Sequence, residues 1–86
     1  MQRPSGSGAG RKREKAFGRV LQEVRKERGL SQEQLGFESG YHRTYISFLE
    51  RGKKSPSLST IMDLAETLRV PASDMIHRVE IILRSK

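Results

Sequence analysis

Cysteine and tryptophan are both absent from this 86-residue chain, and aromatic residues make up only 6% of it. Without cysteine it can form no disulfide, no thiolate metal site and no cysteine nucleophile, which fits a reducing compartment. No apolar run approaches the ~18 residues of a membrane-spanning helix. The basic N-terminus is followed by no apolar stretch, so we expect no secretory signal. A chain this short buries only about 60–65% of its unfolded surface, which predicts a single thin core without a cofactor domain.

Positive charge is what the chain has in excess, because 17 Lys and Arg face 10 Asp and Glu and leave a net charge of +7. Residues 1–13 carry +4 and residues 41–54 carry +3, whereas residues 30–40 carry −2. Such an excess predicts an acidic partner, most simply nucleic acid. Residues 1–13 are rich in Gly, Ser and Pro and lack apolar periodicity, so we expect a disordered basic tail. The tail is either a solubilising leader or an arm lying along phosphates or in a minor groove.

Apolar residues recur with helical spacing in five segments, and none alternates with the period of a strand. The expected helices cover residues 14–28, 32–39, 42–51, a fourth from residue 58 to the break at Pro71, and a fifth from residues 72–74 onward. Ser31 and Gln34 form a capping box at the start of the second helix, and Ser57 is a plausible cap of the fourth. The chain is therefore predicted to be all-α, with residues 14–86 forming one domain.

The second and third helices are short and are joined by a turn at Gly40, and the third helix is basic. This combination is the helix-turn-helix signature. Residues 18–76 resemble the lambda-repressor/Cro-like (XRE-type) DNA-binding domain. The resemblance lies in RKERGLSQEQLG (25–36), RTYISFLERGKKSPSL (43–58) and LAETLRVPASDMI (64–76). It implies a compact five-helix, lambda-repressor-like domain that binds double-stranded DNA without a cofactor or metal. It also implies a cytoplasmic, nucleoid-associated protein of a bacterium, phage or plasmid.

Two finer features qualify this resemblance. The RTYIS run and the extra apolar helix at the end are similar to those of restriction–modification controller proteins. Gly36 stands where the family usually has Ala; it permits close approach of helices but lowers helix propensity.

The exposed face of the third helix is expected to read base edges in the major groove. Ile46 and Leu49 are three residues apart and should face the core, which exposes the opposite side. An Arg can bind guanine with two hydrogen bonds, and a Thr offers a hydroxyl or meets a thymine methyl. The expected base-contacting residues are Arg43, Thr44, Ser47, Phe48 and His42.

Two of these residues have an alternative role, and His42 needs a separate argument. Ser47 could be an ordinary solvated residue, and Phe48 could pack against Tyr45 or Tyr41 instead of DNA. His42 stands where the resemblance implies a capping Ser or Thr; because His is a poor cap, we expect it to contact DNA.

A second group of residues is expected to bind phosphates, which positions the protein without reading sequence. It consists of Gln32, Tyr45, Arg51, Lys53, Lys54 and Ser57. For Arg51 the alternative is neutralisation of the helix dipole, and for Lys53 and Lys54 it is simple solvation in a loop. The resemblance also implies that Arg25 pairs with Glu50 and ties the first helix to the third, and that Gln32 supports the recognition helix.

A single recognition helix reads few base pairs, so this class generally binds palindromes as two-fold dimers with half-sites about 34 Å apart. Val79, Ile82 and Leu83 exceed what one thin core requires, and we expect a homodimer through the last helix. The alternative is that these residues only cover the first and fourth helices.

The predicted function is therefore a sequence-specific transcriptional regulator without enzymatic chemistry. Repression or autoregulation is the default, and activation through RNA polymerase is the alternative. Two rivals remain: an antitoxin or accessory module that grips a protein partner and binds DNA secondarily, and a non-specific DNA coater. No paired acid and base, metal cluster or phosphate loop supports an enzyme.

Overall fold

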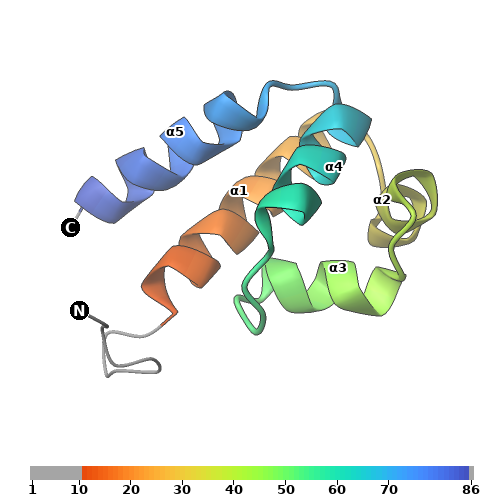
Figure 1. Cartoon of the computed structure of the whole chain (residues 1–86), viewed down its shortest axis with the longest axis horizontal. Helices are drawn as coiled ribbons and strands as arrows, with labels where there is room; N and C mark the ends of the chain where they lie inside the picture. The colour runs from red at the N-terminus through yellow and green to blue at the C-terminus, as the bar shows by residue number, and fades with distance from the viewer. Residues whose placement is uncertain (1–10, 86) are drawn as a thin grey trace.

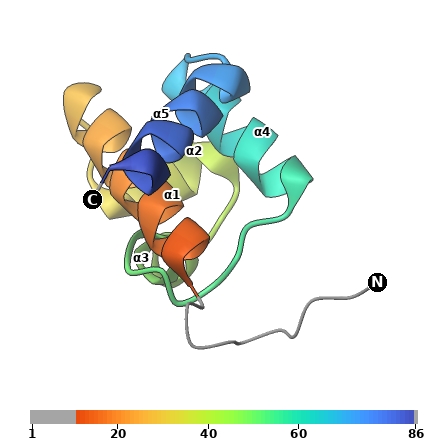
Figure 2. The same cartoon turned by 90° about the vertical axis from the view of Figure 1, so that its left-hand side faces the viewer.

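The computed structural model describes residues 11–85, and within that range it contains five helices and no strand (Figure 1). They are α1 (Lys12–Glu27), α2 (Gln32–Ser39), α3 (Arg43–Glu50), α4 (Leu58–Leu68) and α5 (Ala72–Arg84). Helix α1 runs through the middle of the domain and contacts α3 at one end, while α5 lies alongside it (Figures 1 and 2). Helix α2 packs on α3 and α4. The all-α, five-helix prediction is confirmed.

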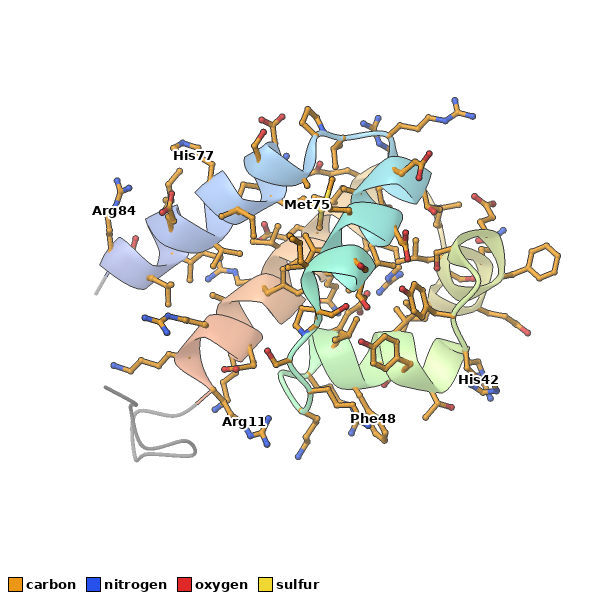
Figure 3. The ribbon with its side chains drawn as sticks, in the orientation of Figure 1. Arg11, His42, Phe48, Met75, His77 and Arg84 are labelled. Carbon is orange, nitrogen blue, oxygen red and sulfur yellow. The ribbon has the colours of Figure 1, made fainter. Side chains whose placement is uncertain are left out.

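One hydrophobic core joins all five helices. Leu21 of α1, Leu35 of α2, Leu64 of α4 and Met75 of α5 are fully buried. Met75 lies in the interior between α5 and α4 in Figure 3. Ile46 and Leu49 of α3 are also fully buried, as their spacing predicted. The opposite side of α3 is therefore left for other contacts.

Two glycines allow the helices to approach unusually closely. A Cβ atom at Gly18 of α1 would collide with the carbonyl oxygens of Leu49 and Glu50, so α1 crosses the end of α3 at backbone contact. At Gly36 of α2 a Cβ would lie 2.5 Å from the carbonyl oxygen of Tyr41. Gly36 therefore does permit close approach, as its departure from the usual Ala suggested.

The predicted start of the first helix, and the predicted end of the tail, are corrected. Helix α1 begins at Lys12, two residues before the expected Glu14. Arg11 adopts a left-handed conformation with φ 70° and its carbonyl accepts from the Lys15 amide at 2.8 Å, which starts the helix. Residues 11–13 thus belong to the folded domain, whereas residues 1–10 of the expected tail lie outside the described residues.

The ends of α3 are also shifted by one residue on each side. The sequence predicted residues 42–51, but His42 and Arg51 are the flanking cap residues of an Arg43–Glu50 helix. Ser31 and Gln34 form the expected capping box of α2, and the Ser57 hydroxyl accepts from the Thr60 amide at the start of α4. Those two caps confirm the sequence prediction.

Candidate nucleic-acid interface

A buried carboxylate fixes α3 to the rest of the domain. Glu50 accepts from Arg25 Nε at 2.6 Å and Nη2 at 2.9 Å, and from Gln32 Nε2 at 2.9 Å. The side chains of Arg25 and Glu50 are only 8% and 2% exposed. The hydrogen bond with Glu50 raises the pKa of Arg25 even though burial opposes this. The expected Arg25–Glu50 pair is confirmed, and it holds α1, α2 and α3 in one arrangement.

Gln32 has the structural role that the resemblance implied, support of the recognition helix. Its side-chain nitrogen is bonded to Glu50 across the helix-turn-helix, so the side chain ties α2 to α3. Its backbone lies in the first turn of α2, where helix N–H groups favour an anion. Phosphate binding by Gln32 stays a prediction.

The N-terminal end of α3 is capped by a histidine. The His42 Nδ1 atom accepts from the Thr44 amide at 3.0 Å. The expectation that His42 is a poor cap was wrong, because the unprotonated ring nitrogen acts as the acceptor that a Ser or Thr oxygen usually supplies. The Nε2 atom is then the protonated nitrogen of the neutral ring and can donate to a base or phosphate. A base contact by His42 remains a prediction, but its original reason is gone.

Arg43 and Thr44 form the freest part of the recognition face. Both side chains are exposed. Neither forms a side-chain hydrogen bond or ion pair with any residue in the described range. Their hydrogen-bonding groups are thus available to a ligand without breaking a bond within the domain.

Two cations that follow α3 lie over an aromatic ring in its C-terminal half. The Arg51 guanidinium carbon lies 5.2 Å from the centroid of the Phe48 ring, and Lys54 Nζ lies 5.9 Å from it. Arg51 Nε also donates to the Ser47 hydroxyl at 3.2 Å. Phe48 is half-buried under these cations at the lower edge of Figure 3. This arrangement places positive charge on the same face as Ser47, where the sequence predicted DNA contacts.

The two tyrosines near α3 pack on each other. The ring centroids of Tyr41 and Tyr45 lie 5.4 Å apart. The tyrosine rings therefore pair with each other, and within residues 11–85 neither forms a ring pair with Phe48. The Tyr41 hydroxyl lies 3.3 Å from Thr60 Oγ1 and donates to Asp63 at 2.7 Å, which ties the turn to α4. The hydrogen bond with Thr60 lowers the pKa of Tyr41, but Asp63 and burial raise it, and the net shift is upward.

The loop after α3 presents two further lysines. Lys53 and Lys54 are exposed, and the Lys53 amide donates to the Phe48 carbonyl at 2.8 Å. Ser57, at the far end of the loop, uses its hydroxyl to cap α4 and shares a hydrogen bond with Thr60 Oγ1 at 3.0 Å. A phosphate contact by Ser57 would have to share that engaged hydroxyl.

Comparison with known proteins identifies the architecture. A family model described as helix-turn-helix matches residues 21–75. The control protein C.BamHI of Bacillus amyloliquefaciens is 39% identical over 61 residues, which cover 70% of this chain and 75% of that protein. The chain belongs to the helix-turn-helix family.

Two solved structures extend this assignment of the helix-turn-helix domain. The restriction-modification controller protein C.AhdI from Aeromonas hydrophila is 40% identical with a TM-score of 0.70, and the match covers 72% of this chain and 94% of that one. The controller protein C.Esp1396I, solved as a tetramer with its natural 35-base-pair operator, is 26% identical with a TM-score of 0.74. That match covers 84% of this chain and 96% of the other. The resemblance to XRE-type domains is confirmed, and its relatives include controller proteins.

The expected dimer residues of this helix-turn-helix domain differ in exposure. Val79 is only 8% exposed and belongs to the core, because α5 turns it toward the buried side of the domain. Ile82 packs on the same core, whereas Leu83 is 39% exposed. Val79 is therefore mostly covered by its own domain, but it lines one groove with Leu83, so a dimer contact by Val79 stays a prediction. The sequence missed Ile76, which is 39% exposed on the same helix.

Ile76 and Leu83 line a groove of about 570 Å³ between α5, α4 and the start of α1. Its lining also includes the apolar residues Phe17, Ile61 and Val79 and the charged residues Arg13, Glu14 and Glu80. Ile81, which is 47% exposed, does not line it. The groove is thus an apolar surface with charges of both signs.

Residues 11–85 contain neither a membrane-spanning helix nor a cluster of metal ligands. No helix there is long and apolar enough to span a membrane. Within the same range, no three His, Cys, Asp or Glu residues gather as metal ligands would.

Proposed function

We propose that this chain is a sequence-specific transcriptional regulator that inserts α3 into the major groove of DNA. The observation that carries the proposal is the contrast between the two sides of α3. Its inner side is held by the Arg25–Glu50–Gln32 network, and its outer side exposes Arg43 and Thr44 with no bond to the described domain. A rigid helix that offers unengaged donors is what direct readout of bases requires.

Base contacts fall to Arg43 and Thr44, with Ser47, Phe48 and His42 beside them. Phosphate contacts fall to Arg51, Lys53 and Lys54, supported by Gln32, Tyr45 and Ser57. The complex of C.Esp1396I, a relative with the same fold, with its operator supports DNA binding by this chain. No enzymatic step is needed, and the protein would act in the cytoplasm, where the DNA is.

The regulator binds as a homodimer whose contact lies around Ile76 and Leu83. Two copies related by a two-fold axis present two α3 helices to half-sites about 34 Å apart. An apolar groove whose lining includes charges of both signs suits a self-complementary interface. Ile76→Asp should shift the sedimentation of the protein toward the monomer. Ile81→Asp is the matched control, because Ile81 does not line the groove; equal effects of both changes would contradict this interface.

Repression by blocking RNA polymerase is the mode of action we propose, with control of its own gene. The controller-protein relatives suggest the narrower role of timing a restriction endonuclease. A restriction endonuclease gene beside the gene of this protein would support that role, and a toxin gene in its place would favour the antitoxin alternative.

Selection of bound sites from a random duplex library tests the proposal most directly. The selected sequences should be palindromic, and the protein should prefer them over random duplex by ~10³ or more. Equal affinity for selected and random duplex would instead identify a non-specific DNA coater. Salt dependence cannot separate these two functions, because both rest on phosphate contacts.

A further inference from the structure

Arg11 joins the start of α1 to the loop that follows α3. Its guanidinium Nη1 donates to the Lys53 carbonyl at 2.9 Å and lies 3.4 Å from the Gly52 carbonyl. Figure 3 shows Arg11 on the same lower edge of the domain as Phe48 and His42. A residue 42 positions away in the sequence therefore contacts the loop that carries the candidate phosphate-binding lysines.

The loop is also fixed at Gly52, which is buried against α1. Gly52 has φ +71°, and a Cβ there would lie 2.6 Å from Lys15 Cγ and 3.0 Å from Lys15 Cα. The Gly52 amide donates to the Leu49 carbonyl at 3.1 Å. The loop backbone is thus bonded to α3 through its amides and to α1 through its carbonyls, so the start of α1 sets where the loop lies.

We propose that Arg11 is a positioning residue for DNA binding, which holds the loop so that Lys53 and Lys54 meet the phosphates next to α3. The proposal rests on the proposed function. A guanidinium bonded to two carbonyls restricts the loop before DNA arrives. Without it, the loop and its two lysines would be less restricted before binding, and the additional ordering on binding weakens affinity.

Lys12 provides a matched control for charge. It follows Arg11 directly, is exposed, and donates no side-chain hydrogen bond to any described residue. Lys12→Ala removes the same charge from nearly the same place without touching the loop. A difference between Arg11→Ala and Lys12→Ala therefore reports the contact with the loop.

The first experiment measures the loop without DNA. Amide hydrogen exchange should become faster at Gly52 and Lys53 in Arg11→Ala and stay unchanged in Lys12→Ala, while both variants keep the wild-type unfolding transition. Unchanged exchange in Arg11→Ala would overturn the proposal, because the loop would then be held without Arg11.

The second experiment measures affinity for a random-sequence duplex of ~25 base pairs, long enough for two half-sites, over a range of salt. Arg11→Ala should bind on the order of three- to tenfold more weakly than Lys12→Ala. If Arg11 acts through the loop, Lys53→Ala should cost less affinity in the Arg11→Ala background than in wild type. The salt slope of the double variant should then equal that of Lys53→Ala, once the change in slope caused by Lys12→Ala has been subtracted.

Two results would overturn the positioning role alone. The first is equal affinity of Arg11→Ala and Lys12→Ala for the duplex. The second is that the affinity losses of Arg11→Ala and Lys53→Ala add fully in the double variant, and that its salt slope falls by about one more than that of Lys53→Ala. The additive result would mean that Arg11 contacts a phosphate itself. If wild-type protein bound neither random nor selected duplex, the proposed function would fail, and this role in DNA binding with it.

Discussion

Glu50 and Arg51 are neighbours at the C-terminal end of α3, yet they lie in opposite environments. The Glu50 side chain is 2% exposed and accepts hydrogen bonds from Arg25 and Gln32. Arg51 is exposed, and among residues 11–85 its side chain contacts the Ser47 hydroxyl, the Phe48 ring and no acidic residue. One charge therefore joins three helices, whereas the other stays within α3 at the surface.

The difference shows how one short helix can serve both the fold and a ligand. A buried charge has lost its hydration, so removing its partner leaves a large uncompensated cost. An exposed cation remains hydrated, and its local contacts contribute little. Charges on the inner side should thus affect mainly stability, and those on the outer side mainly DNA affinity.

Breaking the inner network should give the largest effect. Glu50→Ala leaves the Arg25 guanidinium buried without its carboxylate, and the free energy of unfolding should fall by about 3–5 kcal/mol. Urea denaturation measures this change. The matched control is Arg25→Met combined with Glu50→Leu, which removes both charges and should recover much of the lost stability. A loss below about 1 kcal/mol in Glu50→Ala would place Glu50 with the surface charges.

Arg43→Ala tests the outer side at its N-terminal end. It should weaken binding to the selected site by about 1–3 kcal/mol and relax preference at one base pair. Its unfolding free energy should stay within about 0.5 kcal/mol of wild type, because the side chain is exposed. Arg84→Ala is the control for charge, since Arg84 lies at the far end of α5 from α3 (Figure 3). Equal weakening on selected and random duplex would show that Arg43 reads no base.

The residues on the inner side of α3 could be predicted from the sequence, because the signals for them come from near neighbours in the chain. Helical spacing alone places Ile46 and Leu49 on one face, and the turn chemistry of Ser31 and Gln34 depends on neighbouring residues. The Arg25–Glu50 pair came from the family resemblance, which carries long-range information that spacing lacks.

Prediction from the sequence fell short for residues that meet distant parts of the chain, and where it relied on the average behaviour of a residue type. Val79 lies on an apolar stripe, but a stripe does not say whether another helix or another copy covers it. His42 was judged by the average behaviour of its residue type, although one ring nitrogen suffices to cap a helix. Arg11 looked like part of a basic tail, because its carbonyl partners lie more than 40 residues away.

Tyr41→Phe measures an intermediate case, a partly buried side chain that ties the turn to α4. Loss of the hydrogen bond to Asp63 should lower the free energy of unfolding by about 0.5–1.5 kcal/mol. Because the pKa of Tyr41 is raised in the folded state, this contribution is present below the ordinary pKa of 10.0 and disappears as the pH rises through the raised value. Tyr45→Phe is the matched control, because the Tyr45 hydroxyl has no hydrogen bond within residues 11–85. Equal losses in the two variants would show that the bond to Asp63 contributes nothing.

Arg51→Ala should have the smallest effect on stability and completes the comparison with Glu50. Its bond to Ser47 and its place over Phe48 are exposed, so the free energy of unfolding should change by less than about 0.5 kcal/mol. Affinity for random duplex should nevertheless fall, and the salt slope should drop by about one if Arg51 binds a phosphate. An unchanged slope would leave Arg51 as a neutraliser of the helix dipole. A loss of stability like that of Glu50→Ala would instead show that neighbouring charges on α3 do not divide between fold and ligand.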